Sequence, residues 1–399
     1  MVAVETRGRR FSVDPRGRPN RSPCRVVTAL LYFVLMTRDG SRRLRILIAP
    51  DSFGDTMSAV VAANAISRGW AAARPDDSLV RAPQSDGGPG FVDVLASRFG
   101  TLVTEDVHGP LGAGVTARWL FDAASSTAYV ECAQACGLHQ LGGRPTPRTA
   151  VAATTHGVGE LVAAALARGA RRLVVGLGGS STTDGGAGLV DALGGPEAAR
   201  ERLAGVEIVV ASDVENPLLG ALGAATVFGP QKGADPETVE LLEKRLTEWS
   251  VTLNGLAGRD VTADAGAGAA GGLGAALLAL GGRRVSGAAV VADATDLTDD
   301  VAAADLVITG EGKFDAQTLR GKVVSALHHA ASTSGAGGAG ARTLVLAGQV
   351  ALSPDEVEEA GIAGAHAIVD VAGSVEVAMS DAENQLVKLA EAVAGSFAG

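Results

Sequence analysis

The sequence is poor in cysteine and in aromatic residues. Its 399 residues include 3 Cys, and aromatic side chains make up 4% of the chain. Three cysteines cannot form a disulfide framework, which favours a reducing cytoplasm as the location. No stretch approaches the roughly 18 consecutive apolar residues of a membrane span, and the net charge of −10 argues against duplex nucleic acid as the main partner. We therefore expect neither a nucleic acid nor a membrane as partner.

Apolar residues and glycine are abundant instead. Hydrophobic residues make up 47% of the chain, and 54 residues are glycine. Such an apolar content excludes a disordered polymer. The length exceeds that of one ordinary domain, so we expect two domains, each with its own core. The many glycines and few aromatic residues favour ligand loops lined by backbone rather than by stacked rings.

The first 45 residues carry the opposite charge to the rest. They contain eleven Arg against three acidic residues, a net charge of +8, whereas the other 354 residues carry −18. An apolar run over 26–36 resembles the core of a signal or transit peptide, but no small-residue cleavage site follows it. The alternative is that Met36 is the true start. Residues 1–43 are therefore predicted to be a disordered or misassigned extension outside the fold.

Short apolar runs alternate with helical patterns at both ends of the remaining chain. The predicted strands are 45–49, 78–82, 305–309, 343–347 and 365–369, and the predicted helices are 59–73, 91–99, 322–332, 355–360 and 375–393. Ser58 is expected to cap the first helix, and Pro75 to end it. Alternation of this kind predicts parallel strands with helices on both faces of the sheet.

The middle of the chain has a different order of elements. We expect strands over 102–107, 116–121, 128–131, 172–176 and 207–211, and helices over 156–167 and 236–253. The pattern predicts an α/β fold in which a doubly wound parallel-sheet domain, 44–100 and 288–399, is interrupted by a second α/β domain, 101–287. The low-complexity segment 334–341 is expected to be a flexible surface loop.

Four carboxylates lie in the turns that follow strands of the first domain. They are Asp51, Asp86, Glu311 and Asp315. These turns share the carboxyl edge of an open parallel sheet, where ligands bind. Each acid alone could be an ordinary turn or cap residue. Four on one edge favour a functional site.

Two glycine-dense loops lie in the middle domain. Residues 176–188 (GLGGSSTTDGGAG) follow a strand and lead into a helix, so their amides and the helix N-terminus could surround an anion. Residues 263–277 also run into a helix. Flexible turns use the same residues. Three of the 5 lysines, Lys232, Lys313 and Lys322, lie beside glycine, where an ammonium would suit a transferring phosphoryl group; the alternative is that they are ordinary surface lysines.

Several familiar motifs are missing. Reading back from Lys322 gives no G-x-x-x-x-G-K-[ST] phosphate loop, the protein-kinase motifs H-R-D and D-F-G do not occur, and the GLGGSS string lacks the third glycine of a dinucleotide site. Cys132 and Cys136 have no neighbouring His to complete a metal site, so they are expected in the core. His328 and His329 are expected to be ordinary surface or half-buried residues.

Longer strings follow one another from about residue 45 to the C-terminus. They are IAPDSF (48–53), SDGG (85–88), THGVGEL (155–161), GLGGSSTTDGGAG (176–188), DVENPLLG (213–220), GAATVFGPQKGA (223–234), GAGAAGGLGAA (266–276) and ADLVITGEGKFDAQTLRGK (304–322). Together they resemble the type I glycerate kinase family, which phosphorylates D-glycerate with ATP. The resemblance implies a flavodoxin-like domain, a second α/β domain inserted in it, and an active site in the cleft between them.

The resemblance also implies roles for the residues in these strings. ATP is the expected donor, and Mg²⁺ is expected to be held through water and one or two carboxylates, with its ligands unassigned. Asp184 is the first candidate for the catalytic base and Asp315 the second, with Lys232 as a phosphate contact. The predicted substrate-binding residues are Asp51, Ser52, Asp86 and Lys322. The predicted nucleotide-binding residues are Gly178, Gly179, Ser180, Thr182, Gly185 and Glu311.

Three features depart from the family pattern. Gly54 stands where a lysine is usual, Pro89 replaces an acid, and the segment after residue 194 is shorter. These departures leave two alternatives open. The chain could bind small acids or nucleotides without turnover, or it could phosphorylate a different hydroxy acid or sugar acid. The 2-hydroxyl is the favoured acceptor, and a homo-oligomeric state is left open.

Overall fold

The computed structural model describes residues 43–397, apart from 55, 317, 321–322 and 335–339. Three sequence predictions therefore lie wholly or mostly outside the described residues. They are the N-terminal extension 1–43, the role of Lys322, and the flexible loop 334–341.

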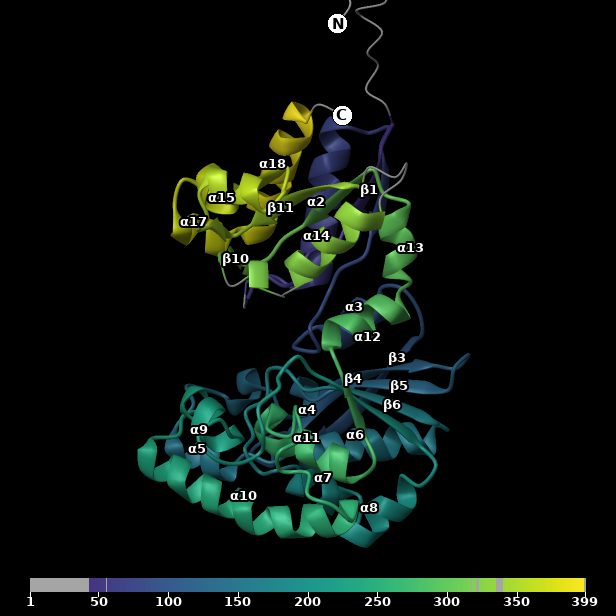
Figure 1. Ribbon diagram of the computed structural model, residues 1–399, viewed down its shortest axis with the longest axis vertical. Helices are drawn as coiled ribbons and strands as arrows, with labels where there is room; N and C mark the ends of the chain where they lie inside the picture. The colour runs from purple at the N-terminus through teal and green to yellow at the C-terminus, as the bar shows by residue number, and fades with distance from the viewer. Residues whose placement is uncertain (1–42, 55, 317, 321–322, 335–339, 398–399) are drawn as a thin grey trace, which may run out of the picture. The chain divides into compact units, whose positions relative to one another are not determined.

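Five parallel strands form the first sheet (Figure 1). They are β1 (Arg45–Ile48), β2 (Ser78–Arg81), β9 (Leu306–Thr309), β11 (Arg342–Ala347) and β13 (Gly364–Ala367). Their order is β13-β11-β9-β1-β2. Numbered by first appearance this is 2-1-3-4-5, the flavodoxin-like order, which confirms the predicted fold class. The order reverses between β1 and β9, and ligands bind at such a switch point, outside the carboxyl ends of the strands.

Helices cover both faces of this sheet. Alternate side chains of β1 point to opposite faces, and the apolar side chains on each face are buried under helices. Ile46 and Ile48 are buried against α2 (Ala59–Ala73) and α18 (Ala382–Ser396). Leu47 is buried on the other face with residues of α13 (Leu297–Ala302) and α14 (Val323–Ser334). Ser58 caps α2 as predicted, since its Oγ accepts a hydrogen bond from the Val61 amide at 3.3 Å.

Six strands form the second sheet, in sequence order. They are β3 (Thr101–His108), β4 (Gly114–Asp122), β5 (Thr127–Glu131), β6 (Arg172–Gly176), β7 (Glu207–Ala211) and β8 (Arg283–Val285). The first two pairings are antiparallel and the rest are parallel. Residues of α6 (His156–Ala167), α7 (Ala187–Ala192), α10 (Pro236–Ala257) and α11 (Ala269–Ala279) share its largest core cluster. Residues of α3 (Phe91–Ala96) and α12 (Gly287–Ala294) are buried with its opposite face.

Shorter α-helices and strands lie between these elements. They are α4 (Ala133–Cys136), α5 (Pro147–Ala152), α8 (Pro196–Arg202), α9 (Ala224–Phe228), β10 (Lys313–Phe314), β12 (Gln349–Val350), α15 (Pro354–Glu359), α16 (Ile368–Ala372) and α17 (Val375–Ser380). Cys132 and Cys136 are buried in the core, as predicted. The strands of the first sheet come from 45–81 and 306–367, and those of the second from 101–285; the finer domain boundaries stay a prediction.

Two predicted elements near the C-terminus are wrong in their extent. The strand expected over 365–369 ends at Ala367, and Ile368 begins α16. The helix expected over 375–393 is divided into α17 and α18 at Asp381. The Asp381 carboxylate accepts hydrogen bonds from Asn384 and Gln385, and such local bonding favours a helix boundary over a helix interior.

One described segment, Pro147–Ala167, is long and apolar enough to cross a membrane by length and composition alone. It is not one helix in the fold, since α5 and α6 are separated by residues 153–155, and half of the tested window is buried inside the protein. The segment therefore has the character of core helices, which pass the same test.

A buried carboxylate joins β5 to α3. Glu131 is 2% exposed, and its Oε2 accepts hydrogen bonds from the amides of Gly90 (3.1 Å) and Val92 (3.2 Å) at the start of α3. Burial raises the pKa of Glu131 to about 7, although these amides oppose the rise. The carboxylate is thus held in its charged form at a cost above neutral pH.

Glu131→Gln is expected to raise the free energy of unfolding at pH 8 by up to about 3 kcal/mol, because it removes the buried charge and keeps one oxygen for both amides. In the unfolded chain the acid titrates near its ordinary value. The parent therefore loses stability as pH rises from about 4.5 to about 7, and Glu131→Gln should lack this slope. Urea denaturation of both proteins at pH 5 and pH 8 measures this change in the free energy of unfolding. A parent that is equally stable at both pH values, or a variant with the same slope as the parent, would contradict the prediction.

Candidate functional site

Backbone hydrogen bonds hold the acidic turns of the first sheet together. The amide of Asp51 donates to Gly310 O at 2.8 Å, beside Glu311, and the amide of Gln84 donates to Pro50 O at 2.8 Å. Asp51 Oδ1 accepts from the amide of Ser52 at 2.6 Å. The turns after β1, β2 and β9 are therefore neighbours at the switch point, as the sheet order requires.

The turn that carries Asp86 also contacts the glycine-rich loop that follows β6. Asp86 Oδ1 accepts from the amide of Gly88 at 3.0 Å, which shapes the turn. The amide of Gly178 donates to Gly87 O at 3.0 Å, and a Cβ on Gly178 would lie 2.3 Å from Gly88 Cα. The two backbones can approach this closely because Gly178 has no side chain. A continuous run of contacts thus links the Asp51 and Asp86 turns to the 176–188 loop.

Pro89, one of the departures from the family pattern, packs on the same loop. A Cβ on Gly179 would lie 2.5 Å from Pro89 Cγ. Gly179 has φ +72°, a conformation that favours glycine. The proline therefore fits against the glycine-rich loop instead of leaving a gap there.

Most amides of the glycine-rich loop already have protein acceptors. Ser181 donates to Cys136 O at 2.8 Å and Gly185 to Gly271 O at 3.0 Å. The second glycine loop, 263–277, thus packs against the first. Within the described part of the chain, the amides of Gly179, Ser180, Thr182, Thr183 and Asp184 donate to no protein acceptor, and of these residues only Gly179 is exposed. The surface available to an anion is smaller than the whole loop that the sequence suggested.

Lys232 lies behind this loop, 3% exposed. Its Nζ donates to Ser180 Oγ at 2.9 Å and to Thr182 O at 2.6 Å. Burial lowers the pKa of Lys232 to about 8, and the nearby Asp184 opposes the fall. The alternative of an ordinary surface lysine is excluded by this burial. The ammonium holds the backbone of residues 180–182 in place.

Asp184 lies where the loop meets α6 and α7. Its Oδ2 accepts from the Thr155 amide and hydroxyl, both at 2.8 Å, and from the Gly188 amide at 3.1 Å, while Oδ1 accepts from the Gly186 amide at 3.1 Å. A carboxylate with this many donors fixes the turn into α7. This arrangement favours a positioning role over proton transfer.

The other predicted residues lie in two places. Asp315 follows β10 in the first-sheet region, where its carboxylate is 28% exposed and lies 3.5 Å from Lys313 Nζ. Thr182 and Gly185 are buried within the glycine-rich loop; Trp249 Nε1 donates to Gly185 O at 2.9 Å. Lys322, as noted, is outside the described residues.

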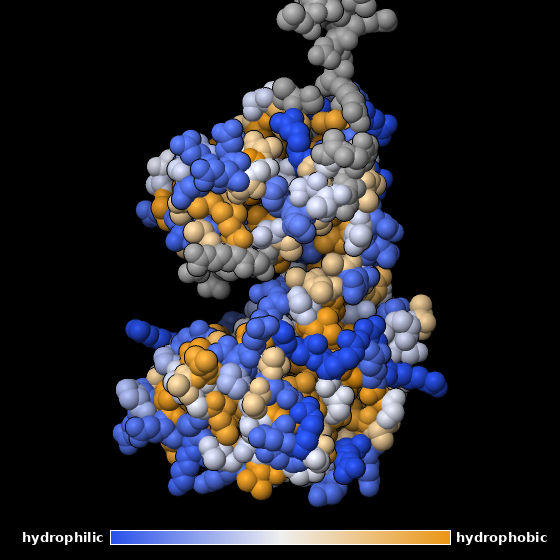
Figure 2. Space-filling view, viewed as in Figure 1, coloured by the Kyte–Doolittle hydropathy of each residue, from blue (hydrophilic) through white to orange (hydrophobic). Residues whose placement is uncertain are grey.

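Two cavities adjoin the turns. One, of about 290 Å³, is lined by Gln84, Asp213 and mainly apolar residues of α12, α13 and α14. The other, of about 260 Å³, is lined by Phe53, Gly54, Gly312, Gly348 and residues of α16 to α18. Apolar side chains are exposed over α17 beside it, at the left of the upper half of Figure 2, where Val375 and Met379 are 48% and 61% exposed. Both cavities could admit part of a small ligand.

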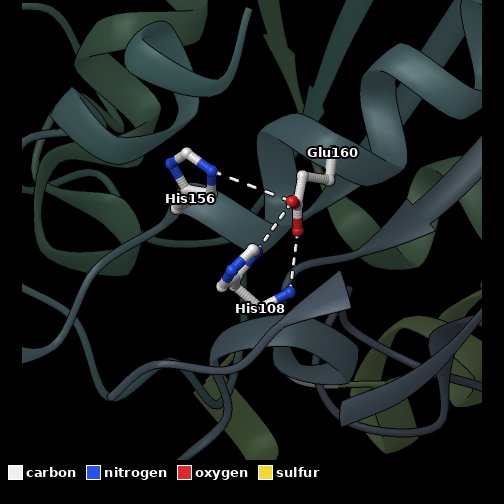
Figure 3. A group of neighbouring side chains, drawn as sticks. All are labelled: His108, His156 and Glu160. Carbon is white, nitrogen blue, oxygen red and sulfur yellow. Dashed lines mark hydrogen bonds and ion pairs between the residues drawn. The ribbon is translucent and has the colours of Figure 1, made fainter. Parts of the chain in front are cut away.

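The carboxylates at the switch point are suitable ligands for Mg²⁺. This ion binds oxygen atoms, usually from one or two carboxylates together with substrate phosphates. Among the described residues, the only group of three or more possible ligands close enough to share an ion is elsewhere. It consists of His108, His156 and Glu160 (Figure 3). The only local pattern that points to it in the sequence is a His and a Glu four residues apart on a predicted helix.

The chain is similar in sequence and in structure to several known proteins. A family model described as the glycerate kinase family matches residues 46–197 and 196–398. A glycerate kinase of Bacillus subtilis (strain 168) is 36% identical over 380 residues, covering 89% of this chain and 98% of that protein. A glycerate 2-kinase of Escherichia coli (strain K12) is 38% identical over 306 residues, covering 70% and 80%. The crystal structure of a protein assigned as glycerate kinase 2 from Salmonella typhimurium LT2 is similar with a TM-score of 0.71 and 34% identity, covering 89% of this chain and 98% of that chain.

Proposed function

Because the chain belongs to the glycerate kinase family, and is therefore a kinase, we propose that it transfers the γ-phosphoryl group of ATP to the 2-hydroxyl of D-glycerate. The observation that carries the proposal is the contact of the Asp86 turn with the glycine-rich loop at Gly88 and Gly178. It puts an acidic turn, suited to metal and hydroxyl groups, beside the exposed Gly179, whose amide is suited to phosphate. The similarity to a glycerate 2-kinase supports the choice of hydroxyl.

Phosphoryl transfer needs mainly positioning and neutralisation of charge. In this proposal Asp51, Ser52, Asp86 and Lys322 hold the glycerate. Carboxylates of the same turns would hold a Mg²⁺ ion, which would supply positive charge to neutralise the phosphates. Gly179 and Ser180, whose amides have no acceptor in the described part of the chain, bind the nucleotide phosphates together with Glu311. Gly178, Thr182 and Gly185 shape the loop that presents them. Lys232 keeps the loop in its binding conformation. The apolar cavity beside Gln84 accepts the flat adenine ring. We place the reaction in the cytoplasm.

Of the two candidate bases, we propose that Asp315 takes the proton of the glycerate hydroxyl. Asp184 already accepts four close hydrogen bonds that position its own loop. Asp315 lies in the same first-sheet region as the turns that we assign to glycerate. A positioned general base contributes about a hundredfold or more to the rate.

Asp315→Asn is expected to lower kcat at least about a hundredfold and to remove the rise of kcat/KM with pH on the acid side. Stability should fall by no more than about 1 kcal/mol, because the ion pair with Lys313 is partly exposed. Asp184→Asn should act differently. The asparagine must place its NH₂ group against N–H or O–H groups that now donate to the Asp184 carboxylate. The substitution should therefore lower the melting temperature as well as the activity. Steady-state kinetics across pH and thermal melts of both variants test the assignment. A stable Asp184→Asn variant without the acid-side rise would instead make Asp184 the base.

The activity itself is tested by coupled ADP release with and without D-glycerate, and the position of the product phosphate is read by phosphorus NMR. We expect ADP release that depends on both D-glycerate and Mg²⁺, with 2-phosphoglycerate as the product. A 3-phosphate product would overturn the regiochemistry. A panel of other hydroxy acids and sugar acids tests the substrate, and a better acceptor among them would overturn the choice of glycerate.

The second candidate function is binding of small acids or nucleotides without turnover, motivated by Gly54 and Pro89. Pro89 packs on Gly179, which supports an intact loop contact and so the first function. Nucleotide binding without ADP release from any acceptor would favour this second function over the first.

A further inference from the structure

Three side chains that the proposed phosphoryl transfer does not use come together beside α6 (Figure 3). His108 is the last residue of β3, and His156 and Glu160 are four residues apart in α6, so they share one face of the helix. One ligand atom from each residue lies within 4.8 Å of the others. Two imidazoles and one carboxylate are a ligand set typical of zinc.

The distances between these atoms suit a metal ion. Glu160 Oε1 lies 2.8 Å from His108 Nδ1 and 3.8 Å from His156 Nε2. Ligand atoms arranged tetrahedrally around zinc lie about 3.3 Å apart, because each is bound at about 2.0–2.1 Å. The two separations bracket that spacing. Small side-chain rotations would therefore admit an ion, with room for a water molecule as a fourth ligand.

A second set of contacts orients the same side chains. The other ring nitrogen of His156, Nδ1, lies 3.3 Å from Asp191 Oδ2. The other oxygen of Glu160, Oε2, accepts from the backbone amide of His108 at 2.7 Å. Histidines and carboxylates that bind metals are typically held in this way, which fixes the atom that faces the ion. His156 Nε2 and Glu160 Oε1 are thus the atoms presented to the site.

We infer that His108, His156 and Glu160 bind one divalent transition-metal ion of the zinc type, with Asp191 orienting His156. Nitrogen ligands distinguish this site from a magnesium site, which takes oxygen ligands. All three side chains are partly exposed, so an ion can reach them. Thr155, which precedes His156, holds Asp184 of the glycine-rich loop. The bound ion therefore stiffens the segment on which that loop is anchored.

The test is calorimetric titration of the full-length, chelator-treated protein with Zn²⁺ in excess Mg²⁺. We expect one ion per chain. His156→Gln and Glu160→Gln should each weaken binding at least about tenfold, and Asp191→Asn about ten- to a hundredfold. Co²⁺ in place of Zn²⁺ should give the visible absorption of a site with nitrogen ligands.

The matched control is His139→Gln, which removes an exposed histidine outside the cluster and should keep the parent affinity. If His156→Gln fails to fold, judged by circular dichroism, His108→Gln decides instead, because its side chain is 56% exposed. Absence of stoichiometric Zn²⁺ binding would overturn the inference. So would equal affinity in the parent and in the double variant His108→Gln/His156→Gln.

Discussion

Lys232→Met is expected to lower kcat/KM for glycerate phosphorylation about a thousandfold, equivalent to about 4 kcal/mol of transition-state stabilisation. The ammonium holds Ser180 Oγ and Thr182 O, and methionine cannot donate to either. The 180–182 backbone then loses the conformation in which it would meet phosphate. Pre-organised donors of this kind are worth a hundredfold or more each.

The same substitution should change stability by no more than about 2 kcal/mol, because two effects oppose each other. Burial lowers the pKa of Lys232 from 10.5 to about 8, so keeping the charge at pH 7 costs the fold about 3 kcal/mol. Methionine removes that cost and leaves Ser180 and Thr182 without their donor, which costs a similar amount. Between pH 8 and 10.5 the unfolded parent retains the proton that the folded parent has released. The parent should therefore gain stability over this range, and Lys232→Met should not.

Lys244→Met is the control, because the Lys244 side chain is 77% exposed on α10 and lies 4.0 Å from Glu248. We expect parent activity and parent stability for it. Steady-state kinetics and urea denaturation at pH 7 and pH 9.5 measure all three proteins. Full activity in a folded Lys232→Met would remove the lysine from the proposed mechanism.

Helices and strands could be predicted from the sequence wherever neighbouring residues determine where they begin and end. Helices α2 and α6 and strand β6 begin and end at the residues expected from apolar periodicity, caps and flanking glycine or proline. The break at Asp381 was missed because it depends on side-chain hydrogen bonds within an otherwise helical pattern. The grouping of the acidic turns was predictable too, since parallel strands bring their carboxyl ends to one edge.

The parts of the site that depend on distant partners could not be predicted. Lys232 looked like a loop lysine, and its burial follows from packing against residues about fifty positions earlier. The family resemblance makes Asp184 the first candidate for the base, but its partner Thr155 lies 29 residues earlier in the chain, and no local pattern relates the two. His108 is 48 residues from His156, and no sequence spacing relates them. The roles assigned to the site residues stay predictions.

Gly178→Ala should reduce activity to background and lower the free energy of unfolding by about 3 kcal/mol or more. The added Cβ would lie 2.3 Å from Gly88 Cα and 2.9 Å from the Gly88 amide nitrogen, and backbone atoms cannot move aside as a side chain can. The Asp86 turn and the glycine-rich loop must then separate. The proposed mechanism needs these two segments in contact, so activity should fall more than stability alone explains.

Gly255→Ala is the matched control, since Gly255 is exposed in α10 and a Cβ there meets nothing within 4 Å. This variant should be stabilised by about 0.5–1 kcal/mol, because alanine loses less backbone freedom in a helix, and it should keep parent activity. Urea denaturation and ADP-release kinetics, measured where each variant is fully folded, separate the effects. If folded Gly178→Ala keeps the kcat/KM of the parent, phosphoryl transfer does not require contact between the Asp86 turn and the glycine-rich loop. The proposed site would then be wrong.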